Sequence, residues 1–92
     1  SGIISDVSVF EPLYFWNYTM FRNCFYNNYY LGYDQTGKTT LVENWDLSYP
    51  DPQALFILNT FYFDRPNGEG ECWLLAQIIL TIIPINFVKH YF

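Results

Sequence analysis

Hydrophobic and polar residues alternate over short stretches of this chain, and few stretches show the spacing of a helix. Over residues 1–9, isoleucine and valine are separated by serine and aspartate, which predicts a short strand or an ordered arm. Glu11-Pro12 interrupts that pattern. The run LYFWNYTMF, residues 13–21, has more strand-forming than helix-forming residues, so we expect a further strand there.

The clearest turn signal lies within CFYNNYYLGYDQTGKTTLVENW, residues 24–45. Asp34 can accept a hydrogen bond from the main chain two residues on, and Gly37 tolerates the left-handed conformation that closes a type I turn with a bulge. We therefore predict a β-hairpin with its turn at residues 34–37. One face of its first strand then carries Phe25, Asn27, Tyr29, Leu31 and Tyr33.

The second half of the chain consists of apolar runs separated by breaks. SYPDPQ is a break because its two prolines exclude a regular ladder, and DRPNGEGE is a second turn. We expect buried strands over residues 54–63 and 72–83, and a short final segment over 85–92. The pattern thus predicts a single all-β domain over residues 1–92, an antiparallel meander of about six strands that forms a partial or small barrel.

Aromatic residues make up 23% of the chain. They are more than a domain of 92 residues can easily enclose. Such an excess indicates a ligand cavity, a partner surface or a lipid-facing surface. The uncharged run over residues 72–88 is somewhat short for a membrane-spanning helix and contains Gln77 and Pro84. We interpret it as a buried strand, with a membrane segment as the alternative.

Charge excludes one class of partner. The chain has four basic and nine acidic residues and a net charge of −5, whereas nucleic-acid binding needs clustered lysine and arginine. Catalytic and metal-binding patterns are also missing from the sequence. His90 is the only histidine. Glu69 and Glu71 flank a glycine in a turn, where a solvated loop is a simpler interpretation than a pair of carboxylates for acid–base chemistry. We therefore expect no enzyme activity, no metal site and no cofactor.

The two cysteines, Cys24 and Cys72, are separated by 48 residues and do not form a CxxC motif. In an oxidising compartment, a bridge between them would close a long loop and stabilise a small domain. The alternative is two buried free thiols. Asn17-Tyr18-Thr19 is a glycosylation acceptor at Asn17, and the chain starts at Ser1, as in a processed protein. Together these features predict a secreted protein.

The stretch from Cys24 through Asn28-Tyr29 and Gly37-Lys38 to Val42-Glu43-Asn44 resembles the second strand and hairpin of lipocalins of the apolipoprotein D and bilin-binding type. DPQALFILNTFYF and ECWLLA are similar to later strands of that family, so the resemblance covers residues 24–76. The family's Gly-x-Trp motif is absent, and its closed eight-stranded barrel is built from a longer chain.

The resemblance implies a secreted carrier whose barrel-like site binds a small apolar ligand. The inward-facing residues of the hairpin and later strands would form the wall, with the hydroxyl groups of Tyr29 and Tyr33 as polar contacts. The alternative for each is ordinary core packing. The predicted wall residues are Tyr29, Leu31, Tyr33, Leu41, Phe56, Leu58 and Leu74.

A second function is favoured by the short chain and by its two long apolar runs, whereas the cysteine, the glycosylation acceptor and the hairpin pattern favour the carrier. The chain would then be a non-enzymatic structural or interaction protein that assembles through its apolar strands. Its partner would be another protein, as for an accessory subunit of a complex, or further copies of itself in a homo-oligomer.

Overall fold

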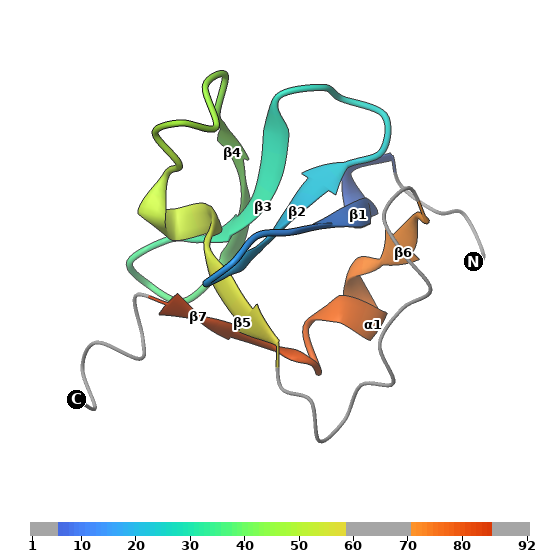
Figure 1. The fold of residues 1–92 in the computed structure, drawn as a ribbon. Coiled ribbons are helices and arrows are strands. Elements are labelled where there is room, and N and C mark those ends of the chain that lie inside the picture. The colour runs from blue at the N-terminus through green and yellow to red at the C-terminus, as the bar shows by residue number, and fades with distance from the viewer. Residues whose placement is uncertain (1–5, 59–70, 86–92) are drawn as a thin grey trace.

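The computed structural model describes residues 6–58 and 71–85, and its strands form one antiparallel sheet (Figure 1). The sheet has seven strands and does not close into a barrel. The prediction of an all-β antiparallel fold is confirmed, with seven strands instead of about six. The elements in chain order are η1 (Asp6–Ser8), β1 (Val9–Tyr14), β2 (Thr19–Asn23), β3 (Tyr29–Tyr33), β4 (Thr39–Glu43), η2 (Pro52–Ala54), β5 (Phe56–Leu58), β6 (Trp73–Leu74), α1 (Leu75–Ile78) and β7 (Ile82–Pro84).

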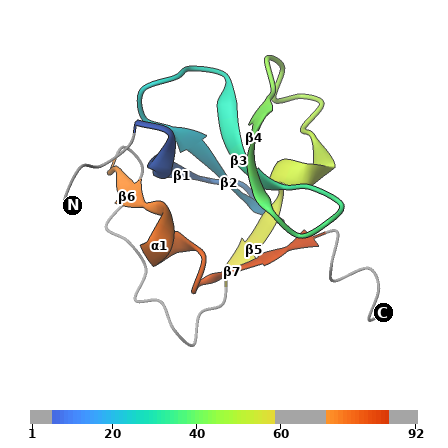
Figure 2. The ribbon, with the colours of Figure 1, turned by 180° about the vertical axis from the view of Figure 1, so that it is seen from behind.

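The first four strands form the expected meander, since each pairs with the next. β6 pairs with the other edge of β1. The second edge of β2 is shared, because Arg22 pairs with Tyr30 of β3 while Thr19 pairs with Phe56 of β5. The sheet therefore divides at β2 into two wings, β3–β4 and β5–β7, which are also separate in the view from behind (Figure 2).

Pro12 lies inside β1, so the predicted interruption at Glu11-Pro12 was wrong, as was the single strand over residues 13–21. The ladder explains how the sheet accepts a proline. Hydrogen bonds from the Phe15 N–H to the Tyr18 carbonyl and from the Cys24 N–H to the Val9 carbonyl fix the odd residues of β1 as the ones bonded to β2. Pro12 is out of phase with them, so its missing N–H lies on the other edge, beyond the two residues that pair with β6.

The turn of the hairpin predicted around residues 34–37 is confirmed, and its strands are β3 and β4. The first strand begins at Tyr29, so placing Phe25 and Asn27 on its face was wrong; Asn28 has a φ of 70°, which breaks the extended chain before β3. The Asp34 N–H donates to the Lys38 carbonyl at 2.9 Å, and Gly37 has a φ of 85°. The Asp34 carboxylate accepts from the Thr36 N–H at 2.8 Å, from the Thr36 hydroxyl at 2.6 Å and from the Lys38 N–H at 3.0 Å. The turn is thus organised by one side chain, as expected for an aspartate at this position.

The long apolar strand expected over residues 72–83 is instead a two-residue strand, a four-residue helix and a three-residue strand. Polar side chains stabilise the break. The Gln77 side chain accepts from the Leu74 N–H at 3.2 Å, and the Thr81 hydroxyl donates to the Ile78 carbonyl at 2.7 Å. These bonds satisfy main-chain groups that a strand would have paired across the sheet.

The strand expected over residues 54–63 begins only at Phe56, because Asp51 caps the short helix η2 before it. The Asp51 carboxylate accepts from the Gln53 N–H at 2.9 Å. Residues 59–70, which include most of the second predicted turn, and residues 86–92 lie outside the described part of the chain. So do residues 1–5 of the strand or arm predicted over 1–9, of which Asp6–Ser8 forms the short helix η1.

Hydrophobic side chains are buried on both faces of the sheet. One cluster is formed by Phe10, Phe21, Leu31, Phe56, Ile78 and Ile82, and the other by Met20, Tyr30, Val42 and Ala54. Adjacent residues such as Met20 and Phe21 belong to different clusters because successive side chains of a strand point to opposite faces. Gly32 allows η2 to approach β3, since a Cβ there would lie 2.9 Å from the Gln53 carbonyl oxygen.

The predicted disulfide between Cys24 and Cys72 is present, with a Cα–Cα distance of 6.2 Å. It joins the residue just after β2 to the residue just before β6. Because β6 pairs with β1 through only two residue pairs, the disulfide supplies a covalent link for a short segment that the sheet alone holds weakly.

Replacing both cysteines, as in Cys24→Ser with Cys72→Ser, should lower the free energy of unfolding by up to about 4 kcal/mol. The unfolded chain loses a cross-link between residues 48 positions apart, so its entropy rises. Urea unfolding followed by tryptophan fluorescence measures the change. A reducing agent should destabilise the natural protein and leave the double variant unaffected. Equal midpoints for the two proteins under oxidising conditions would contradict this role.

The turn should make stability depend on pH below about 4. Hydrogen bonds, chiefly from the Thr36 hydroxyl and then from the Lys38 N–H, lower the pKa of Asp34 in the folded protein. Its contribution is therefore complete above the unfolded pKa of about 3.9 and is lost as pH falls through the lower folded value. Asp34→Asn keeps an acceptor oxygen but does not titrate. The stability difference between the two proteins, measured by urea unfolding, should shrink on acidification; a difference that is constant with pH argues against the assignment.

Candidate ligand pocket

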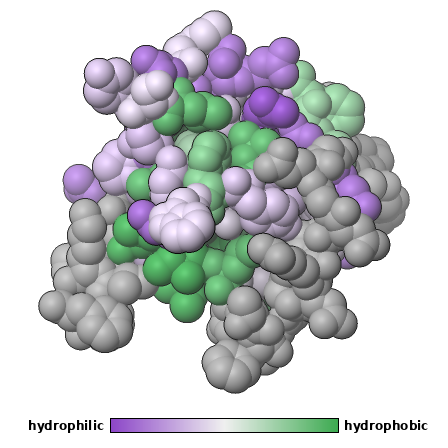
Figure 3. Space-filling model, in the orientation of Figure 1, coloured by the Kyte–Doolittle hydropathy of each residue, from purple (hydrophilic) through white to green (hydrophobic). Residues whose placement is uncertain are grey.

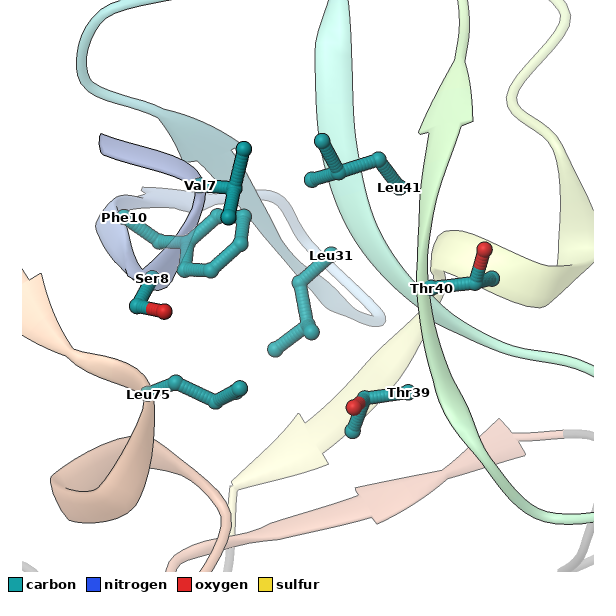
Figure 4. A pocket seen from close by; sticks show the side chains of 8 residues that line it. All are labelled: Val7, Ser8, Phe10, Leu31, Thr39, Thr40, Leu41 and Leu75. Carbon is teal, nitrogen blue, oxygen red and sulfur yellow. The ribbon is translucent and has the colours of Figure 1, made fainter. Parts of the chain in front are cut away.

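A pocket of about 470 Å³ lies between the β3–β4 hairpin and the segments that face it, η1 and α1 (Figure 4). This volume is within the range typical of sites for small molecules. Its lining comes from five elements that are far apart in the sequence. The lining residues are Val7, Ser8, Phe10, Leu31, Thr39, Thr40, Leu41 and Leu75.

The pocket is built directly on the hydrophobic core. Leu31 and Phe10 are each only 1% exposed and belong to the larger core cluster, so they form a rigid apolar base. Leu41 and Leu75 are partly buried residues packed against the same cluster. In Figure 4 the Leu31 side chain lies between those of Leu75 and Leu41, which come from opposite sides of the pocket.

The hairpin register places a hydroxyl group beside this apolar surface. Leu31 pairs with Leu41, and Tyr33 pairs with Thr39, so Thr39 shares a face with both leucines. Figure 4 shows Ser8 and Thr39 on either side of Leu31, whereas the Thr40 side chain points away from the group. The pocket therefore combines apolar walls with two hydroxyl groups, each of which can donate or accept a hydrogen bond.

None of the described residues that line the pocket is charged. Over residues 6–58 and 71–85, histidine, cysteine and acidic residues form no group of three that could hold a metal ion. In the same described ranges, no helix is both long enough and apolar enough to cross a membrane.

Two of the predicted wall residues, Leu31 and Leu41, line this pocket. Three others lie in or against the core. Phe56 is fully buried, Leu58 is partly buried against the core cluster, and the ring of Tyr33 packs edge-on against that of Phe56 at 5.8 Å. Burial raises the pKa of Tyr33.

The remaining two predicted wall residues lie away from the pocket. Leu74 pairs with Val9 in the sheet and is 36% exposed. Tyr29 donates its hydroxyl to Glu43 at 2.8 Å, and this hydrogen bond is the main reason why the pKa of Tyr29 is raised. The tyrosine hydroxyls expected as polar contacts are thus replaced by those of Ser8 and Thr39.

Sequence reasoning missed the other lining residues for different reasons. Thr39 could have been found from the hairpin register, since it lies two positions from Leu41 on the same strand face. Val7 and Leu75 could not, because β1 and the Cys24–Cys72 disulfide bring their segments to the hairpin only in the folded chain.

The chain matches no protein-family model, no curated protein and no solved structure.

Truncating the base of the pocket should cost more stability than truncating its wall. Leu31→Ala removes a side chain that is 1% exposed, and we expect a loss of about 2 to 5 kcal/mol in the free energy of unfolding. Leu41→Ala, on the same pocket but half-buried, is the matched variant and should cost clearly less. Urea unfolding of both variants measures the difference. Similar losses would show that the buried Leu31 contributes no more to the stability of the core than the half-buried Leu41 does.

Proposed function

We propose that this protein is a non-catalytic carrier that binds a small, mostly apolar and uncharged molecule in the pocket between β3–β4, η1 and α1. The observation that supports this most is the make-up of the lining, in which Val7, Phe10, Leu31, Leu41 and Leu75 line an open pocket of about 470 Å³. Burial of apolar ligand surface there supplies binding free energy of about 25 cal/mol per Å².

The polar groups define the ligand further. Ser8 and Thr39 are the hydroxyl-bearing side chains that Figure 4 shows beside Leu31. A neutral hydroxyl or carbonyl on the ligand would satisfy them, whereas a charged group would find no counter-charge among the described lining residues. The proposed ligand is therefore a hydrophobic molecule with one or two neutral polar groups.

The proposed site differs from the one that the lipocalin resemblance implied. A lipocalin encloses its ligand inside a closed barrel, whereas the sheet here is open and the pocket lies between the hairpin and two helical segments. Kinship with lipocalins stays a prediction, and the proposed carrier role depends on the pocket alone.

Secretion is part of the same proposal. The Cys24–Cys72 disulfide is consistent with an extracellular protein, since such bonds persist in oxidising compartments. Asn17 is exposed in the connection between β1 and β2, so a glycan there would not disturb the core. Glycosylation of Asn17 stays a prediction.

A structural or interaction role is the second candidate, and it is favoured by exposed aromatic side chains. Trp16 is 96% exposed, Tyr49 81% and Trp45 71%. Figure 3 shows hydrophobic residues gathered across the middle and lower part of one face, with hydrophilic residues above them. Large exposed aromatic residues are typical of protein interfaces.

The carrier proposal can be tested with N-phenyl-1-naphthylamine, a neutral apolar probe that fluoresces when it leaves water. The natural protein should bind it saturably, and Leu75→Trp should weaken binding at least about tenfold because the larger ring fills the pocket. Ile79→Trp is the matched control, since Ile79 follows the same helix but is 41% exposed and does not line the pocket.

The carrier proposal fails if the probe does not bind, or if the two tryptophan variants bind it equally well. Circular dichroism of both variants should match that of the natural protein, so that a loss of binding is not a loss of fold. An oligomer that forms without ligand and that Leu75→Trp leaves unchanged would favour the interaction role instead.

A further inference from the structure

β4 is at one end of the sheet, and no described strand pairs with its outer edge. Hydrogen bonds from the Asp34 N–H to the Lys38 carbonyl and from the Asn44 N–H to the Asn28 carbonyl show that the even-numbered residues face β3. The main-chain groups of the odd residues therefore point away from the sheet. Among the described residues, β4 pairs with β3 alone, which leaves the edge formed by Thr39, Leu41 and Glu43 free.

An exposed cluster of one carboxylate, Glu43, and two aromatic side chains, Tyr29 and Trp45, lies at the end of this edge. Both oxygens of the Glu43 carboxylate are used, because Oε1 accepts from the Trp45 indole N–H and Oε2 accepts from the Tyr29 hydroxyl at 2.8 Å. The two bonds, that of Trp45 more than that of Tyr29, lower the pKa of Glu43, so the group is charged at neutral pH. They also hold two aromatic rings beside the negative charge.

The surroundings keep this charge uncompensated. No ion pair to Glu43 is present in the described part of the chain, where the ion pair of Arg22 with Glu11 belongs to β1 and β2. Over residues 29–51 there are four acidic residues and a single basic one, Lys38, and the whole chain carries a charge of −5. A group that binds here should therefore be cationic.

We infer that the free edge of β4 binds an extended segment of a partner protein, and that an arginine of this segment contacts Glu43 and Trp45. The partner strand would extend the sheet, as in other cases of β-strand addition. The guanidinium group would pair with the carboxylate and lie against the exposed indole ring, a combination that suits arginine better than lysine because its charge is planar.

A second copy of this chain fits the edge less well. In an antiparallel pairing of β4 with itself, odd residues face odd residues, so the side chain of Lys38 lies on the opposite face from Glu43. No cation then meets the carboxylate, and two chains of charge −5 repel each other. The charge on this edge thus favours a basic partner.

The experiment uses the acetylated, amidated peptide Thr-Val-Thr-Arg-Thr-Val-Thr, in which both valines and the arginine share one strand face. We expect saturable binding, followed by tryptophan fluorescence and by nitrogen–proton correlation spectra of the β4 amides and the Trp45 indole N–H. Replacing arginine by citrulline, which keeps the shape without the charge, should weaken binding about fivefold. Methylating the backbone nitrogens of both valines should abolish it, because these N–H groups would bond to β4.

Protein variants test the same contact from the other side. Glu43→Gln keeps an acceptor oxygen for either Tyr29 or Trp45. It should weaken binding of the arginine peptide about fivefold and leave binding of the citrulline peptide unchanged. Asp46→Asn, which removes a nearby exposed charge outside β4, should change binding less than about twofold.

Four outcomes would overturn the inference: no binding of the arginine peptide, equal binding of the citrulline peptide, equal binding of the methylated peptide, or equal effects of Glu43→Gln and Asp46→Asn. Sedimentation equilibrium is the final check. A dimer of the free protein that the methylated peptide leaves intact and the arginine peptide cannot dissociate would assign the edge to a second copy.

Discussion

The second edge of β2 pairs with two strands, and the layout of the molecule depends on this division. β3 pairs at one end of the edge and β5 at the other, so neither wing of the sheet can extend along the whole strand. A single continuous sheet would leave one face exposed or would have to close on itself. The division instead lets hydrophobic side chains pack on both faces, with Met20 on one side and Phe21 on the other. The interior is thus built without a barrel.

The pocket is a consequence of the same arrangement. The β3–β4 wing leans away from β5–β7, and the segment from Cys72 to α1 faces it from the other side (Figure 2). The disulfide holds this segment beside the end of β2 through Cys72, which is three residues before Leu75. One covalent bond therefore stabilises the fold and positions one wall of the candidate site. The base of the pocket, Leu31 and Phe10, belongs to the core, so its shape is as fixed as the core itself.

The many aromatic residues serve two different purposes. Phe10, Phe21, Tyr30 and Phe56 fill the interior, and the edge-on contact between Phe21 and Phe56 is part of that packing. Others remain in solvent, and Trp45 is held there by a hydrogen bond to a charged side chain. A side chain that is both exposed and oriented loses little conformational freedom when a partner binds. The hydrogen bond thus gives the exposed Trp45 ring a defined orientation.

The sequence by itself determined the local features, since each depends on residues close together in the chain. The hairpin follows from the hydrogen-bonding capacity of Asp34 and the backbone freedom of Gly37, and the all-β class follows from the strand-forming composition. The disulfide was also predicted, because the chain has only two cysteines to pair. From the hairpin pattern, Leu31 and Leu41 were placed on one face, and both line the pocket.

Only the tertiary structure decided which strands share an edge, and with that the site. Pro12 is accepted in β1 because its nitrogen lies beyond the two residues that pair with β6, which no local pattern reveals. The run after Cys72 looked like one strand, but Gln77 and Thr81 bond to the main chain and turn it back. Val7, Ser8 and Leu75 meet the hairpin through contacts between distant segments. Such contacts depend on how the whole chain packs, because the free energy that favours them comes from burial shared by all the segments together.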